Sequence, residues 1–159
     1  MTAPPLSFWH PASLLATWFG SGLLPKMPGT WGSLSALPFA AGLVWLGGPW
    51  TLLAAAAAMF VVGLWASARY AAHLGLPDPG AVVVDEVVGQ WLAIVPVALD
   101  PPSYATAFLF FRFFDIVKVW PANVLQRRLT GGWGIMADDV VAGAYAGAAT
   151  FAVLHLMRP

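Results

Sequence analysis

The stretch of residues 49–68, PWTLLAAAAAMFVVGLWASA, decides the fold class of this chain. It contains no charged residue, and none occurs anywhere between Lys26 and Arg69. About 20 apolar residues are enough for a helix to cross the hydrocarbon core of a bilayer, and residues 50–68 have this length. The stretch therefore predicts a helix over 50–74 surrounded by apolar groups, either in a membrane or at the centre of a compact bundle.

The composition of the whole chain favours the membrane. Of the 159 residues, 60% are hydrophobic and 9% are charged, and the mean hydropathy is +0.77. Soluble domains are about 45–50% apolar and about 25% charged, so membrane residence is the expected state. The length is that of one domain, predicted over residues 1–159.

The sequence argues against nucleic-acid binding, cysteine chemistry and a signal peptide. The net charge is zero and the sequence has no basic run, which argues against nucleic-acid binding. Cysteine is absent, so disulfides, thiolate metal sites and cysteine nucleophiles are excluded. The first residues lack the charged start, apolar run and cleavage site of a signal peptide, so none is expected.

Glycine, proline and serine divide the chain into predicted helices. Ser33 or Ser35 is expected to cap a helix over 34–46, and Gly47-Gly48-Pro49 then breaks the chain. The β-branched start of 82–99 also suits a strand, but a lone strand would leave its backbone unpaired, so a helix is favoured. The remaining expectations are a helix over 12–19 opened by Pro11, one over 104–118 capped by Ser103, a turn or two over 122–129, a loop over 130–134 and a helix over 137–157. The predicted fold is all-α, a compact bundle of five or six apolar helices.

The few charged residues are concentrated rather than scattered. Most fall in four short segments, which contain Lys26; Asp78, Asp85 and Glu86; Arg112, Asp115 and Lys118; and Asp138 and Asp139. An ionisable group in apolar surroundings is costly unless it is paired, binds a metal or lines water. Four such segments suggest one shared polar site where helix ends converge.

The basic residues of this site are predicted on one helix face. Arg112, Asp115 and Lys118 are spaced by three, so they form a ladder of alternating charge along a helix. An ordinary surface ladder has the same spacing. The flanking sequence, FLFFRFFDIVKVW, is aromatic on every side, which argues against a solvated face.

Two acidic pairs, Asp85-Glu86 and Asp138-Asp139, are each expected at a helix start. The helix dipole favours acids there, which is the simplest explanation for either pair. Capping needs one acid, however, so two pairs exceed what two helix starts require. Gly89 and Gly143 lie one turn beyond the pairs and predict close helix packing, which would bring the acids of different helices together.

The residue types of the predicted site favour a hard cation and a phosphate. No cysteine and no histidine cluster accompany its carboxylates, and such an oxygen-only set suits Mg²⁺ first, then Mn²⁺ or Ca²⁺. The five carboxylates meant are Asp85, Glu86, Asp115, Asp138 and Asp139. Arg112 and Lys118 would supply positive charge to a phosphoryl group. The loop with Lys26, Thr30 and Ser33 has the chemistry of an anion cradle, although an ordinary interhelical loop would look similar.

Four segments in order resemble the phosphatidylglycerophosphatase A family. They are GSGLLPKMPGTWGSL (20–34), DPGAVVVDEVVGQ (78–90), FRFFDIVKVWP (111–121) and GGWGIMADDVVAG (131–143), and the likeness spans about residues 20–147. The resemblance implies an Mg²⁺-dependent lipid phosphatase that converts phosphatidylglycerophosphate to phosphatidylglycerol and phosphate. It also implies a bacterial inner membrane, an active site facing the cytoplasm, and one central helix surrounded by others. The family's usual Lys-Pro-x-Pro reads KVWP here, with Val119 in place of the first proline, so the kink is expected to be shifted or softened.

With this resemblance, each candidate residue receives a predicted role. Glu86, Asp115, Asp138 and Asp139 are predicted to hold Mg²⁺, with Asp85 as the base or as a support for a ligand. Lys26, Thr30 and Ser33 are predicted to bind phosphate or the glycerol head group, and Arg112 and Lys118 to stabilise the transition state. The sequence offers no cysteine, no Asp-x-Asp pair and no histidine placed with serine and arginine, which sets aside covalent routes. Direct attack by a metal-activated water remains.

Two alternatives stay open at this point. A non-enzymatic transporter or channel subunit also uses intramembrane acids, but a relay would spread them along a span rather than place them at predicted helix starts. A phosphatase of another lipid or of a soluble phosphomonoester is equally compatible with the residues. Only the family resemblance points to a head group.

Overall fold

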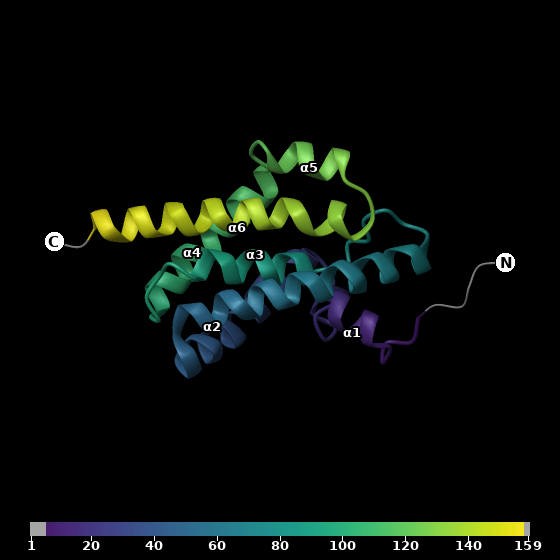
Figure 1. Cartoon of the computed structure of the whole chain (residues 1–159), viewed down its shortest axis with the longest axis horizontal. Helices are drawn as coiled ribbons and strands as arrows, with labels where there is room; N and C mark the ends of the chain where they lie inside the picture. Colours follow the sequence, from purple (N-terminus) through teal and green to yellow (C-terminus); the bar gives the residue numbers. More distant parts are fainter. Residues whose placement is uncertain (1–5, 158–159) are drawn as a thin grey trace.

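The computed structural model describes residues 6–157, and the regular elements of this part of the chain are all helices, with no strand (Figure 1). The predicted all-α bundle is therefore confirmed, while residues 1–5 and 158–159 of the predicted domain lie outside the described range. The elements are α1 (Pro11–Ala16), the 3-10 helix η1 (Ser21–Leu23), α2 (Pro28–Leu74), α3 (Val84–Ile94), α4 (Pro101–Val117), α5 (Ala122–Arg128) and α6 (Gly131–Leu156).

Helix α2 is broken into two limbs at the predicted position. Gly47 and Gly48 have non-helical backbone angles, and Gly48 has a φ of 76°, which favours glycine. Residues from both limbs reach the start of α3, because a Cβ on Gly32 would meet Val83 and one on Gly63 would lie 3.4 Å from Val84. The helix thus folds back on itself and returns to the same end of the bundle.

The first limb begins six residues earlier than predicted. Pro28 opens it, which suits a residue with a fixed φ and no N–H to satisfy. The predicted caps are wrong, because the hydroxyls of Ser33 and Ser35 donate instead to the carbonyls of Gly29 and Gly32 within the helix. Close packing of this glycine-rich turn against α3 explains a helix where the sequence indicates a loop.

Helix α3 is the central element of the bundle. Eight of its 11 residues are buried, and α2, α4 and α6 all pack against it, with α2 and α6 on opposite sides of it in Figure 1. The Trp91 indole donates to the carbonyl of Ala36 at 3.0 Å, which ties α3 to the first limb of α2. One central helix, expected from the family resemblance, is therefore present.

Helices α3 and α6 touch backbone to backbone. A Cβ on Gly143 would lie 2.4 Å from the Gly89 carbonyl oxygen, and one on Gly89 would lie 2.7 Å from the Asp139 carbonyl oxygen. The predicted close packing at these glycines is confirmed. This contact places the second acidic pair beside the first turn of α3.

Two further helix starts differ from the prediction. Helix α6 begins at Gly131, so the loop expected over 130–134 is wrong and Asp138-Asp139 lie two turns inside the helix. A Cβ on Gly132 would lie 2.2 Å from the Leu64 carbonyl oxygen, so packing against α2 holds this poor helix former in place. Helix α4 begins at Pro101 and is capped by Asp100 instead of Ser103, whose N–H donates to the Asp100 carboxylate at 2.8 Å.

Candidate active site

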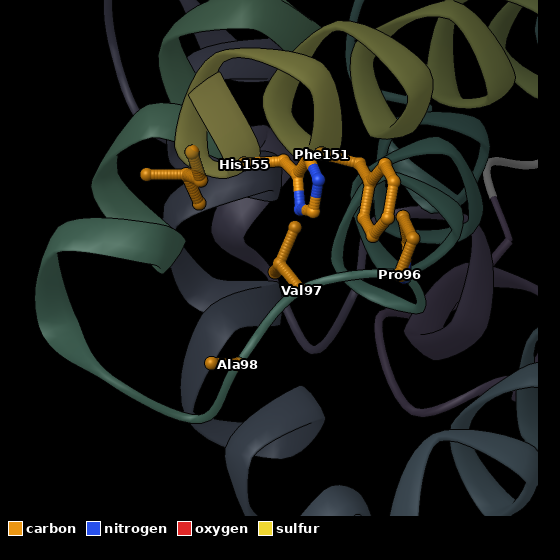
Figure 2. Close-up of a pocket in the computed structure, with 6 residues that line it drawn as sticks. Pro96, Val97, Ala98, Phe151 and His155 are labelled. Carbon is orange, nitrogen blue, oxygen red and sulfur yellow. The ribbon is translucent and has the colours of Figure 1, made fainter. Parts of the chain in front are cut away.

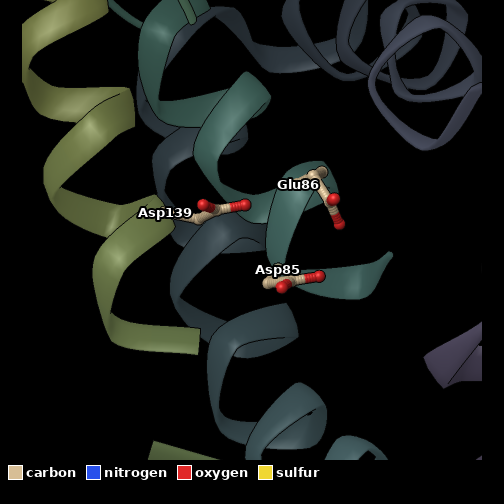
Figure 3. Close-up of side chains that lie close together, drawn as sticks. All are labelled: Asp85, Glu86 and Asp139. Atoms are coloured by element: carbon tan, nitrogen blue, oxygen red, sulfur yellow. The ribbon is translucent and has the colours of Figure 1, made fainter. Parts of the chain in front are cut away.

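Three carboxylates from two helices converge at one point. Asp85 and Glu86 lie in the first turn of α3, and Figure 3 shows Asp139 pointing from α6 toward that turn. One ligand oxygen from each residue lies within 4.8 Å of the other two. We call Asp85, Glu86 and Asp139 the carboxylate cluster.

The surroundings of the cluster disfavour ionised carboxylates. Burial and then the charge of Glu86 raise the pKa of Asp85 well above its ordinary value. Burial also raises the pKa of Glu86, although Arg112 acts in the opposite direction. Carboxylates this close repel one another when all are ionised. Either a bound proton neutralises one of them or a metal cation offsets their charge.

Unpartnered atoms support a cation. Asp85 Oδ1, Glu86 Oε2 and Asp139 Oδ2 are buried and find no hydrogen-bond partner within residues 6–157. Such an atom costs about 1–3 kcal/mol when it stays unsatisfied. An all-oxygen group of this kind fits Mg²⁺, which binds through a few carboxylates and keeps several waters.

The predicted charge ladder is confirmed and reaches a second helix. Arg112 Nη1 lies 2.6 Å from Asp115 Oδ2, and Lys118 Nζ lies 3.7 Å from Asp115 Oδ1. Lys118 also donates to Asp138 Oδ2 at 2.5 Å. Burial lowers the pKa of Lys118, but the hydrogen bond and charge of Asp138 outweigh this and raise it above the ordinary lysine value. Lys118 is therefore a fixed positive charge.

The converging acids differ from the predicted metal ligands. Glu86 and Asp139 belong to both sets, but Asp85 takes part in the cluster while Asp115 and Asp138 contact basic side chains. The difference follows from helix geometry, since neighbouring side chains point about 100° apart. Asp138 consequently points to Lys118 and Asp139 to α3. The metal role of Asp115 and Asp138 remains a prediction.

All five predicted carboxylates share one cavity. Its volume is about 380 Å³. It is lined by Met27, Pro28, Gly29, Asp78, Gly80, Val82, Asp85, Glu86, Arg112, Asp115, Ile116, Lys118, Ile135, Asp138 and Asp139. Asp78 received no role from the sequence, although its charge within an apolar chain was a usable signal.

The predicted anion loop contributes less than expected. Lys26 is exposed and is not among the cavity-lining residues. Ser33 is fully buried and accepts a hydrogen bond from Arg112 Nη1 at 3.4 Å, so it supports Arg112 from behind. The Thr30 hydroxyl is buried and finds no partner among the described residues. Phosphate binding by these three residues stays a prediction.

Gly29 permits the contact between the loop and the cluster. A Cβ there would lie 2.3 Å from Glu86 Oε1 and 3.2 Å from Arg112 Nη1. Only glycine leaves both side chains where they are.

A smaller cavity lies at the other end of α3 and α6. It measures about 120 Å³ and is lined by Pro96, Val97, Ala98, Phe151, Leu154 and His155 (Figure 2). None of these residues is acidic, so this cavity offers none of the chemistry of the carboxylate cluster.

Comparison with known proteins identifies the family of this chain. The family model described as phosphatidylglycerophosphatase A matches residues 14–154. Phosphatidylglycerophosphatase A of Haemophilus influenzae is 38% identical over 96% of this chain and 94% of its own length, and that of Escherichia coli is 36% identical over 92% and 84%. A putative phosphatidylinositol-3-phosphatase of Bacteroides thetaiotaomicron is 40% identical over 83% of this chain and 86% of its own length. No solved structure is significantly similar. The chain therefore belongs to the phosphatidylglycerophosphatase A family, and it is an enzyme of the phosphatase class rather than a transporter.

Proposed function

We propose that this protein is an Mg²⁺-dependent phosphatase that hydrolyses phosphatidylglycerophosphate to phosphatidylglycerol and phosphate. The observation that carries the proposal is the carboxylate cluster, with its oxygens within 4.8 Å, in one cavity with Arg112 and Lys118. Family membership supplies the substrate, because two relatives named for it match along most of their length.

Asp85, Glu86 and Asp139 are the residues that would hold Mg²⁺. The bound ion would offset charge on the phosphoryl oxygens and lower the pKa of water near it. Asp115 and Asp138 hold Arg112 and Lys118 in place. Arg112 and Lys118 would then present their positive charge to a phosphate bound in the cavity.

The reaction is direct displacement at phosphorus. A water oxygen bonds to phosphorus while the bond to the glycerol oxygen breaks, and a cluster carboxylate accepts the proton of the water. The departing glycerol oxygen takes a proton from solvent water, the carboxylate later returns its proton to solvent, and phosphatidylglycerol is left. Lys118 and Arg112 stabilise the charge that develops on the phosphoryl oxygens.

The substrate and the helices support a membrane location. Helices α2 and α6 are long and apolar enough to span one, and the outer surface exposes Trp45, Trp50 and other large apolar side chains. Lys26 directly precedes Met27 and Pro28, which line the cavity, and Arg127 and Arg128 lie in the last turn of α5 between two residues that line an adjoining cavity. By the positive-inside rule, the active site faces the cytoplasm, and the bacterial relatives point to the inner membrane.

The test is phosphate release from phosphatidylglycerophosphate by the detergent-solubilised protein. We expect activity with Mg²⁺, none with EDTA, and none from Asp139→Asn. Asp100→Asn is the matched control, because asparagine caps a helix as well as aspartate does. Normal turnover by Asp139→Asn would contradict the assigned site, and activity in EDTA would contradict the metal requirement alone.

A second substrate belongs in the same assay. The relative named as a putative phosphatidylinositol-3-phosphatase is 40% identical to this chain. Hydrolysis of phosphatidylinositol 3-phosphate without hydrolysis of phosphatidylglycerophosphate would correct the substrate and leave the phosphatase class intact.

A further inference from the structure

A second cavity adjoins the active site. It measures about 290 Å³ and is lined by Pro77, Asp78, Gln126, Leu129, Thr130, Gly131, Gly134 and Ile135. Asp78 and Ile135 also line the cavity of the carboxylate cluster. The two cavities therefore share part of their lining. We call the cavity of about 290 Å³ the Asp78 cavity.

The polar groups of the Asp78 cavity suit hydroxyls. Asp78 offers a carboxylate, Gln126 an amide and Thr130 a hydroxyl, so donors and acceptors are both present. Carboxylates bind sugar hydroxyls in this way in dinucleotide sites. None of the described residues that line it is basic, which makes it a poor place for a second phosphate.

The active-site cavity has chemistry for the phosphate alone. Its carboxylates and basic side chains recognise any phosphoryl group, whatever alcohol carries it. Relatives at 36–40% identity are nevertheless named for two polyol head groups, glycerol and inositol. Discrimination between head groups then requires contacts beyond the phosphate, and the adjoining cavity is positioned to make them.

We propose that the Asp78 cavity binds the polyol that adjoins the scissile phosphate, with Asp78 accepting a hydrogen bond from a polyol hydroxyl. This inference rests on the proposed function and identifies where its head-group specificity arises. A site that hydrogen-bonds a substrate hydroxyl discriminates strongly against a ligand that lacks it, because its polar groups are then left unpaired.

Titration calorimetry with glycerol 3-phosphate and, separately, inorganic phosphate tests this directly. Both titrations contain Mg²⁺ and use the full-length protein in detergent. We expect unmodified protein to bind glycerol 3-phosphate more tightly than phosphate. Asp78→Ala and Gln126→Ala should each reduce this preference, Asp78→Ala by about tenfold, the effect of losing one hydrogen bond to a charged group. Affinity for phosphate should change much less.

Arg127→Gln is the matched control. Arg127 follows Gln126, is exposed and does not line the cavity, so any effect of its charge falls on both ligands and leaves their ratio unchanged. Equal binding of the two ligands by unmodified protein would overturn the proposal, as would an unchanged ratio in Asp78→Ala. The readout is a ratio of two affinities rather than a rate of phosphate release, so failure here is distinguishable from failure of the phosphate-release assay.

Discussion

At the scale of single residues, neighbouring side chains on one helix perform different tasks. Asp139 faces the acids of α3, while Asp138 holds Lys118, and both lie in the same turn of α6. Ser33 does not reach the cavity itself. It is buried and accepts a hydrogen bond from Arg112, which it supports from behind. The type of a residue therefore indicates that it belongs to the site. The direction in which its side chain points indicates what it does there.

Gly29→Ala should reduce activity without unfolding the protein. The added methyl group would overlap Glu86 Oε1, which lies 2.3 Å from that position, and a flexible side chain can move away. We expect at least a tenfold loss of kcat and weaker Mg²⁺ activation, measured by phosphate release over a range of Mg²⁺ concentrations.

Gly42→Ala is the control for this change. Gly42 lies in the same limb of α2 and has no atom near its Cβ position, so alanine there should stabilise the helix by about 0.5–1 kcal/mol and leave activity unchanged. Equal activity of the two variants would show that the Gly29 contact is unimportant.

At the scale of helices, the sequence predicted most elements but misplaced the starts at Pro28, Pro101 and Gly131. The break at Gly47-Gly48 and the helix around Asp85-Glu86 follow from turn chemistry and apolar patterning. The starts at Pro28 and Gly131 do not, because glycine-rich turns look like loops until a neighbouring helix packs on them. The charged segments and their convergence were predictable from the cost of burying charge, whereas the position of Asp85 in one cluster with Glu86 and Asp139 required the observed packing.

Gly143→Ala should destabilise the bundle. Its Cβ would lie 2.4 Å from the Gly89 carbonyl oxygen, and backbone cannot move aside as a side chain can. Overpacking of this kind costs about 1–3 kcal/mol, so thermal unfolding in detergent should occur at a lower temperature, with lower activity as α6 separates from α3.

The neighbouring substitution Ala144→Leu provides the comparison. Ala144 is exposed, so leucine there should leave the unfolding temperature nearly unchanged. A Gly143→Ala protein as stable as the Ala144→Leu protein would argue against the tight α3–α6 contact.

At the scale of the whole molecule, the bundle has two unlike ends. The cavity end gathers the carboxylate cluster with Arg112 and Lys118, while the turn of α2 exposes Trp45, Leu46 and Trp50, which are 78%, 73% and 76% exposed. Tryptophan is favoured at membrane interfaces. This asymmetry predicts that the two ends lie at opposite faces of the membrane.

Single cysteines report this orientation cleanly, because the chain has none of its own. We expect Leu46→Cys to react with a membrane-impermeant thiol reagent applied to cells with a permeable outer membrane. Arg128→Cys should react only after the inner membrane is opened. The reverse pattern of labelling would contradict a cytoplasmic active site.

The position of the cavity at one end of an apolar bundle has a consequence for turnover. On the proposed reaction, the two products differ in the phase that they prefer: phosphate is soluble in water, and phosphatidylglycerol remains in the lipid. Release in two directions separates the products as they form. Recombination would require both to return to the cavity together, so hydrolysis needs no moving lid to be effectively one-way.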